Sequence, residues 1–179
     1  NLVKQEWVML HNSVRRVKRE TTNTIVILRD PIDRWFTGIA QHITTNLFGK
    51  DFGSSHFLDQ ANDLTNRLIV DQVAFDDHTE QQTWFIEEFG QYLIQPVYFY
   101  CDKHLNKNLD HWFESKGLDY QLSNQAHVNV SQNNYDNKNL VDYFKNIVYN
   151  NSMFEIHLAE YYQQDYDLIS TVPFYRQGE

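Results

Sequence analysis

The chain has 179 residues, and its 15 basic and 24 acidic side chains give a formal net charge of −9 at pH 7. This length suits one domain with a sizeable core, and 41% hydrophobic with 15% aromatic residues excludes a disordered or fibrous chain. The mean hydropathy is −0.61, no apolar run approaches the ~20 residues that a bilayer requires, and the acidic balance argues against bulk nucleic-acid binding.

Three apolar runs predict strands. The first, at residues 7–10 just before His11, is weak. The second, Thr-Ile-Val-Ile-Leu at residues 24–28, is β-branched and continuous, which is typical of a parallel strand covered on both faces. The third spans residues 96–100 and starts with Pro96, at a position where strands tolerate proline.

Apolar residues at helical spacing predict helices between and after these strands. The segments are residues 32–43, 79–89, 105–113 (with Gly117 as the predicted C-terminal cap), 140–148 and 153–168. The polar, Asn-rich residues 123–139 predict a long loop. This order of elements predicts an α/β fold with three layers, α/β/α, around a parallel sheet, in a single domain covering residues 1–179.

A candidate anion site lies where the second strand ends. Arg29 supplies a cation there, and Pro31 is typical of the first helical position. The N–H groups of a helix start favour phosphate or sulfate, and ligands of parallel sheets bind at the carboxyl ends of strands. Thr37, eight residues after Arg29, would offer a hydroxyl to the same anion. The alternative is that Arg29 pairs with Asp30 or Asp33 and only ties the turn together.

Residues 24–37, TIVILRDPIDRWFT, resemble the 3′-phosphate-binding motif of sulfotransferases. That motif has a strand, Arg, Asp/Asn-Pro, a second Arg, and Ser/Thr eight residues after the first Arg. The resemblance implies a P-loop nucleotide-kinase-like fold, 3′-phosphoadenosine 5′-phosphosulfate (PAPS) as co-substrate, and sulfuryl transfer to a hydroxyl of a carbohydrate or other small molecule. The resemblance implies that Arg29 and Thr37 bind the 3′-phosphate of PAPS and that Arg34 has a mostly structural role.

Later stretches are similar to the carbohydrate-type branch of the family. His78 and Gln82 match a His-x-x-x-Gln stretch, so we expect both on one helical face, shaping the donor or acceptor pocket. The other matches are the strand and helix at 97–117, the His-x-Asn-x-Ser stretch at 127–131, and a closing Tyr-x-x-Asp-Tyr-x-Leu helix at 161–168. The resemblance spans residues 24–169.

One expected element of this family is not visible. Members of this family bind the 5′-phosphosulfate in a loop near the start of the domain that contains Lys and Ser/Thr. No such loop can be recognised here, and residues 1–36 contain no Gly. Either the segment is missing from the chain, which begins at Asn1, or the protein lacks it. Two alternatives to a sulfotransferase therefore stay open: a truncated or degenerate nucleotide-binding module without turnover, and another P-loop-fold enzyme such as a kinase.

Sulfuryl transfer needs a base for the acceptor's proton, and histidine has a suitable pKa. His11 follows the weak first strand, as the catalytic histidine does in cytosolic members of the family, so it is the predicted base. Glu6 is the reserve candidate, and the alternative for His11 is a surface position. His78 competes for the role, with the alternative that it starts a helix capped by Asp76 or Asp77.

The remaining reactive residues give fewer expectations. The single cysteine, Cys101, excludes an internal disulfide and a cysteine-based zinc site, and its position after a strand predicts a buried, inert thiol. The eight histidines form no metal-ligand pattern, so we expect no metal. Four basic residues, Arg15, Arg16, Lys18 and Arg19, either flank an anionic donor or acceptor or form a solvated linker. With no signal segment ahead of the folded pattern, we expect a cytoplasmic protein.

Overall fold

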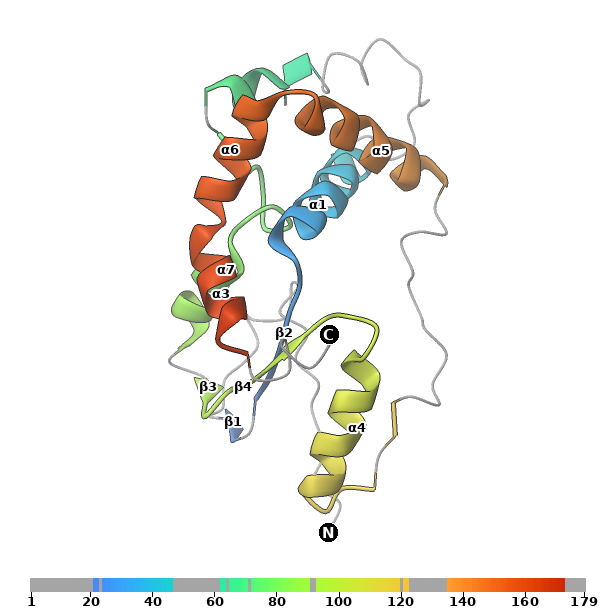
Figure 1. The fold of residues 1–179 in the computed structure, drawn as a ribbon, viewed down its shortest axis with the longest axis vertical. Helices are drawn as coiled ribbons and strands as arrows, with labels where there is room; N and C mark the ends of the chain where they lie inside the picture. The colour runs from blue at the N-terminus through green and yellow to red at the C-terminus, as the bar shows by residue number, and fades with distance from the viewer. Residues whose placement is uncertain are drawn as a thin grey trace.

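The structure of the chain is a computed structural model, which describes residues 21–22, 24–46, 62–63, 65–70, 72–90, 93–119, 121–122 and 135–172. Within these residues the fold is mixed α/β and mostly helical (Figure 1). The described part therefore confirms the α/β class at the level of its elements.

The described strands form two parallel pairs. Strand β1 (Thr21–Thr22) pairs with β3 (Leu93–Ile94), and β2 (Ile25–Leu28) pairs with β4 (Val97–Tyr100) in register from first residue to last. The two strong strand predictions, and their parallel pairing, are confirmed. The predicted weak strand at residues 7–10 lies outside the described residues.

The helices follow the predicted apolar stripes. They are α1 (Pro31–Asn46), α3 (Gln82–Phe89), α4 (Leu105–Ser115), α5 (Tyr135–Tyr149), α6 (Ser152–Tyr161) and α7 (Gln163–Ser170), with a helical stretch at residues 65–69. Helix α5 takes up the last residues of the predicted loop, and the single pattern at 153–168 is divided between α6 and α7 at Tyr162.

Helix α4 ends as its sequence predicts. Gly117 has a φ of +70°, a left-handed conformation that residues with a Cβ rarely adopt. The N–H of Gly117 donates to the carbonyl of Glu114, and the N–H of Leu118 donates to that of Phe113, both at 2.9 Å. These bonds satisfy carbonyls at the helix end that have no partner within the helix.

The main core lies between α1, α5 and α6, and the first two of these lie side by side in Figure 1. Most of the predicted stripe of α1 is fully buried in it, including Trp35, Phe36, Ile39 and Ile43, whereas Ile32 is partly buried. Trp35 also donates from its indole N–H to the carbonyl of Val73 at 3.0 Å, so its one polar group has a partner inside the core.

Helices cover both faces of the β2–β4 pair. Val26 and Leu28 pack against Ile169 of α7 on one face, and Phe99 packs against Leu109 of α4 on the other. Ile27 is nevertheless 44% exposed, so the prediction that the first strong run is covered on both faces throughout is wrong there. Local layering of helix, strands and helix is present, while the wider sheet of a complete three-layer domain is not among the described residues.

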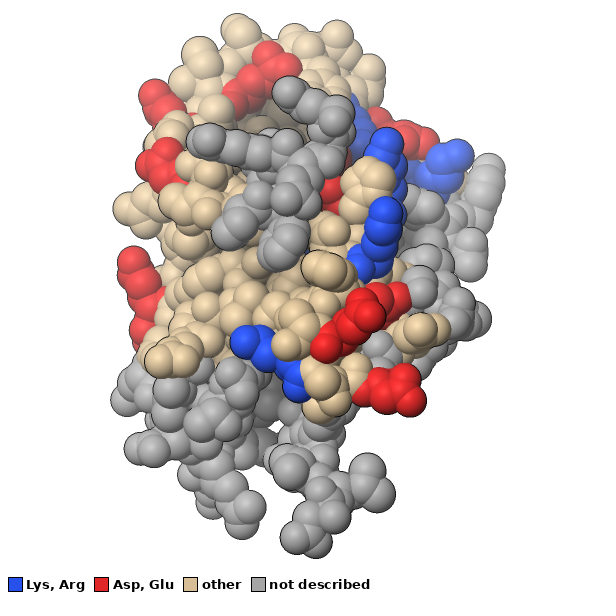
Figure 2. Space-filling view, turned by 60° about the horizontal axis from the view of Figure 1, so that its bottom comes forward, with Lys and Arg blue, Asp and Glu red and all other residues tan. Residues whose placement is uncertain are grey.

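The described helices and the described surface charges bear on two expectations from the sequence, namely that no helix spans a membrane and that the chain does not bind nucleic acid. None of the helices in the described ranges is long and apolar enough to cross a membrane. On the face drawn in Figure 2, Lys and Arg side chains at the right and near the bottom lie close to Asp and Glu side chains, while the charged side chains along the left edge are acidic.

Candidate functional site

Arg29 stands at the carboxyl end of β2 with an exposed side chain. Its neighbouring carboxylates bind other groups. Asp30 accepts from the N–H of Asp33 at 2.8 Å and from the hydroxyl of Tyr166 at 3.4 Å, and Asp33 pairs with Lys145 at 3.5 Å. Within the described part of the chain no carboxylate pairs with Arg29, which argues against the alternative of a purely structural turn.

The N–H groups at the start of α1 were predicted to bind the anion, but the structure gives one of them another partner. The Asp30 carboxylate caps the helix, because it accepts the N–H of Asp33, while the Asp30 carbonyl accepts the N–H of Arg34 at 2.9 Å. A negative side chain thus already occupies the positive end of the helix dipole. The expectation that the first N–H groups of the helix hold the anion is wrong at Asp33, and the Arg29 guanidinium remains as the charge for that task.

Thr37 uses its hydroxyl within its own helix. The hydroxyl oxygen lies 2.9 Å from the carbonyl of Arg34 and 3.2 Å from that of Asp33. A threonine hydroxyl has one hydrogen, so donation to an anion requires it to leave these carbonyls. The side chain is partly buried, and none of the described hydrogen bonds joins it to Arg29.

Gln82 lies at the first position of α3 and binds the backbone of Arg29 from the side. Its Oε1 accepts the N–H of Arg29 at 2.8 Å, and its Nε2 donates to the Arg29 carbonyl at 2.9 Å. The Gln82 side chain is buried. Gln82 therefore lies beside Arg29, and its amide binds the backbone of that residue.

Asp165 of α7 holds this arrangement together and was not among the predicted site residues. Its carboxylate is fully buried and accepts the N–H of Gln82 at 2.9 Å and the N–H and hydroxyl of Thr83, both at 2.8 Å. A carboxylate from a distant helix thus caps α3, whose own cap residue, Gln81, forms no side-chain cap. The signal was available in the closing motif, of which Asp165 is the acidic member.

The tyrosines of that motif, at residues 161–168, also contact the strand-end region. The hydroxyl of Tyr162 donates to the carbonyl of Thr79, and the hydroxyl of Tyr166 donates to Asp30. Burial raises the pKa of both tyrosines, and the Asp30 charge adds to the effect at Tyr166. Both hydroxyls therefore stay protonated and act as donors at neutral pH.

Arg34 of α1 binds the segment of residues 76–83 through hydrogen bonds. Its guanidinium donates to the carbonyls of Asp77, at 2.9 Å, and Glu80, and it lies 5.7 Å from the ring centre of Phe85. Burial lowers the pKa of Arg34, with Tyr162 and Asp165 acting in the opposite direction. These contacts agree with the structural role that the sequence assigns to the second arginine.

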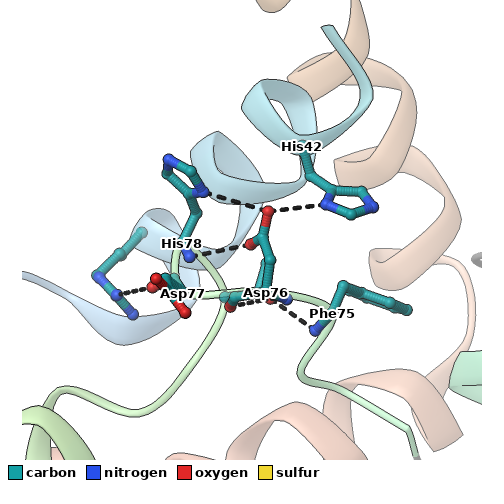
Figure 3. Close-up of polar contacts among 7 residues, drawn as sticks. His42, Phe75, Asp76, Asp77 and His78 are labelled. Atoms are coloured by element: carbon teal, nitrogen blue, oxygen red, sulfur yellow. Dashed lines mark hydrogen bonds and ion pairs between the residues drawn. The ribbon is translucent and has the colours of Figure 1, made fainter. Parts of the chain in front are cut away.

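His78 occupies a turn before α3, so the prediction that it shares a helical face with Gln82 is wrong. The turn forms because Oδ1 of Asp76 accepts the N–H of His78 at 2.9 Å. Oδ2 of the same carboxylate contacts Nδ1 of His42 at 2.7 Å and Nδ1 of His78 at 3.2 Å (Figure 3). Burial alone would raise the pKa of Asp76, but the hydrogen bonds from His78 and His42 outweigh it and leave that pKa well below its usual range.

Cys101 is the first residue after β4 and is exposed, so the prediction of a buried thiol is wrong. Its N–H donates to the carbonyl of Leu28 at 2.7 Å. Because Leu28 is opposite Tyr100, the next residues along each strand, Arg29 and Cys101, are neighbours at the carboxyl edge of the pair. A thiol beside the candidate site offers a place for a chemical label.

The other predicted site residues lie outside the described residues. These are His11, Glu6, the basic cluster at 15–19 and the stretch at 127–131. Among the side chains that the structure describes, no group of three or more His, Cys, Asp or Glu is placed to hold a metal ion.

Comparison of the chain with protein-family models, curated proteins and solved structures found no match. An exposed cation, at the carboxyl edge of a parallel pair and fixed through its backbone, is suited to bind a phosphate group.

Proposed function

We propose that the chain is a PAPS-dependent sulfotransferase, a single domain with a three-layer P-loop nucleotide-kinase-like fold. The exposed Arg29 guanidinium carries the proposal, because it stands at the end of a strand whose backbone is held by Gln82. The order of the sequence motifs supports it, since residues of the first, second and closing motifs contact one another around this strand end.

In this proposal Arg29 and Thr37 bind the 3′-phosphate of the co-substrate. Two or more hydrogen bonds from a guanidinium to phosphate oxygens are charge-assisted and stronger than bonds between neutral groups. Thr37 contributes once its hydroxyl turns from the carbonyl of Arg34 to the phosphate. Gln82 holds the backbone of Arg29. His78, which Asp76 holds in the turn before α3, is the other residue that the resemblance assigns to the donor or acceptor pocket.

The reaction transfers a sulfuryl group to a hydroxyl of a carbohydrate or other small molecule. The acceptor oxygen forms a bond to sulfur while the bond from sulfur to the bridging phosphate oxygen breaks. The acceptor's proton passes to a base, for which His11 is the candidate. The products are a sulfate ester and adenosine 3′,5′-bisphosphate, and no change of oxidation state or metal ion is required.

Transfer of labelled sulfate from PAPS to a panel of mono- and disaccharides tests the function. We expect labelled sulfate ester with wild type, a rate at least about tenfold lower with Arg29→Ala, and an unchanged rate with Lys107→Ala, which removes an exposed charge on α4. Binding of the bisphosphate without transfer to any acceptor or to water would favour a nucleotide-binding module. Phosphoryl transfer from ATP would favour a kinase.

A further inference from the structure

The side chain of Gln82 extends the ladder of β2 by one residue. Successive residues of a strand direct their N–H and C=O groups to opposite sides. Leu28 directs its carbonyl to β4, where it accepts the N–H of Cys101 at 2.7 Å. Arg29 directs both of its backbone groups the other way, and both bind Gln82, at 2.8 Å and 2.9 Å. One side-chain amide thus takes the place of a neighbouring strand.

Asp165 determines which way this amide faces. The Nε2 of Gln82 donates to the Arg29 carbonyl and lies 3.4 Å from Oδ2 of Asp165, while its Oε1 faces the N–H of Arg29. A flipped amide would turn its oxygen toward a carbonyl and a buried carboxylate, which repel it. The same Oδ2 accepts the backbone N–H of Gln82 at 2.9 Å, so both the backbone and the side-chain amide of Gln82 are held.

We propose that Gln82 is a positioning residue that aims the guanidinium of Arg29 at the 3′-phosphate of a nucleotide. This inference rests on the proposed function. The two bonds from Gln82 fix the backbone of Arg29 between the end of β2 and the start of α1, and thereby the direction in which its long side chain leaves. A fixed starting direction reduces the conformational freedom that the side chain loses when it binds phosphate.

Gln81 provides a matched control for this role. Its Nε2 donates to the carbonyl of Tyr161, so it holds the same segment against α6 without contacting Arg29. Gln81→Ala and Gln82→Ala each remove an identical side chain from adjacent positions. If these side chains only stabilise the segment, both variants should change nucleotide binding alike. If Gln82 acts through Arg29, only Gln82→Ala should lower the preference for the bisphosphate.

Calorimetric titration tests the positioning role. Adenosine 3′,5′-bisphosphate and adenosine 5′-monophosphate are titrated separately into wild type, Gln81→Ala, Gln82→Ala, Arg29→Ala and the Arg29→Ala/Gln82→Ala double variant. We expect the preference for the bisphosphate to fall about tenfold in Gln82→Ala, to persist in Gln81→Ala, and to fall no further in the double variant than in Arg29→Ala. Affinity for the monophosphate should stay the same in Gln82→Ala, because that ligand has no group for Arg29.

A wild type that prefers the bisphosphate, together with a Gln82→Ala variant that keeps the whole preference, would overturn the positioning role alone. A wild type that binds both nucleotides equally would overturn the proposed function and this role with it. Hydrogen exchange of the wild-type Arg29 amide serves if Gln82→Ala does not fold. We expect exchange at least about tenfold slower than in an unstructured peptide; an unprotected amide would contradict the anchoring by Gln82.

Discussion

Asp30 and Asp33, the carboxylates beside Arg29 in the sequence, each bind another group in the structure. Asp30 caps α1 and accepts from Tyr166, and Asp33 pairs with Lys145. These contacts leave the charge of Arg29 available to an anion, although the chain as a whole is acidic. At the scale of single residues, the site depends on what the neighbours of Arg29 bind as much as on Arg29 itself.

Asp76 gives a prediction about stability and pH. Its pKa is lower in the folded chain than in the unfolded chain, so it stabilises the fold above its unfolded pKa of about 4, and this contribution is lost as the pH falls through the folded pKa. At pH 7 we expect Asp76→Asn to lower the free energy of unfolding by about 1–3 kcal/mol, because hydrogen bonds from His42 and His78 lose their charged acceptor.

Urea unfolding of wild type and Asp76→Asn across a range of pH checks this expectation. The difference between the two proteins should narrow below about pH 4, because Asp76 then takes up a proton in the unfolded wild-type chain before it does so in the folded chain. Asp77→Asn is the control, because that exposed side chain lies next in the sequence, and its effect should stay within about 0.5 kcal/mol. A difference for Asp76→Asn that is constant down to pH 2 would contradict the role of its charge.

At the scale of elements, α1 and the 76–83 segment approach each other at Gly38. A Cβ built on Gly38 would lie 2.5 Å from the carbonyl oxygen of His78 and 2.9 Å from its carbonyl carbon. Both are backbone atoms, so relief requires the whole segment to move away from α1. The absence of a side chain at Gly38 therefore allows the contacts between Arg34 and the carbonyls of this segment.

Gly38→Ala should accordingly destabilise the protein by about 1–3 kcal/mol, although in a helix alanine is more favourable than glycine by up to about 1 kcal/mol. Gly90→Ala is the matched control, since nothing lies within 4 Å of its Cβ position and its φ of −55° suits alanine. Thermal unfolding of both variants measures the difference. Equal stability of Gly38→Ala and wild type would show that the segment can move away at little cost.

At the scale of the whole molecule, the elements that sequence predicted best are those whose signal is local. Residues 25–28 and 97–100 form strands because their β-branched and aromatic residues suit a packed pair, and α1 forms because its apolar residues recur with the period of a helix. Arg29 and Pro31 mark the junction of strand and helix by position alone, so the candidate anion site was also visible in the sequence.

The parts that sequence reasoning missed depend on contacts between distant segments. Asp165 and Gln82 are 83 residues apart, and no local sequence pattern predicts that Asp165 caps α3, the helix that begins at Gln82. Cys101 is exposed because it follows the last paired residue of β4 at the edge of the pair, which an apolar run cannot reveal. His78 leaves the helix that its spacing predicts because Asp76 captures its N–H in a turn.

The most direct test of the central claim is whether Arg29 recognises a 3′-phosphate. Adenosine 3′,5′-bisphosphate and adenosine 5′-monophosphate are titrated calorimetrically into wild type and Arg29→Ala, with Lys107→Ala as the control for charge. We expect wild type and Lys107→Ala to prefer the bisphosphate, and Arg29→Ala to bind it more weakly by about 1.5–3 kcal/mol, the range of hydrogen bonds to charged groups. Equal binding of the two nucleotides by wild type, or an undiminished preference in Arg29→Ala, would contradict the claim.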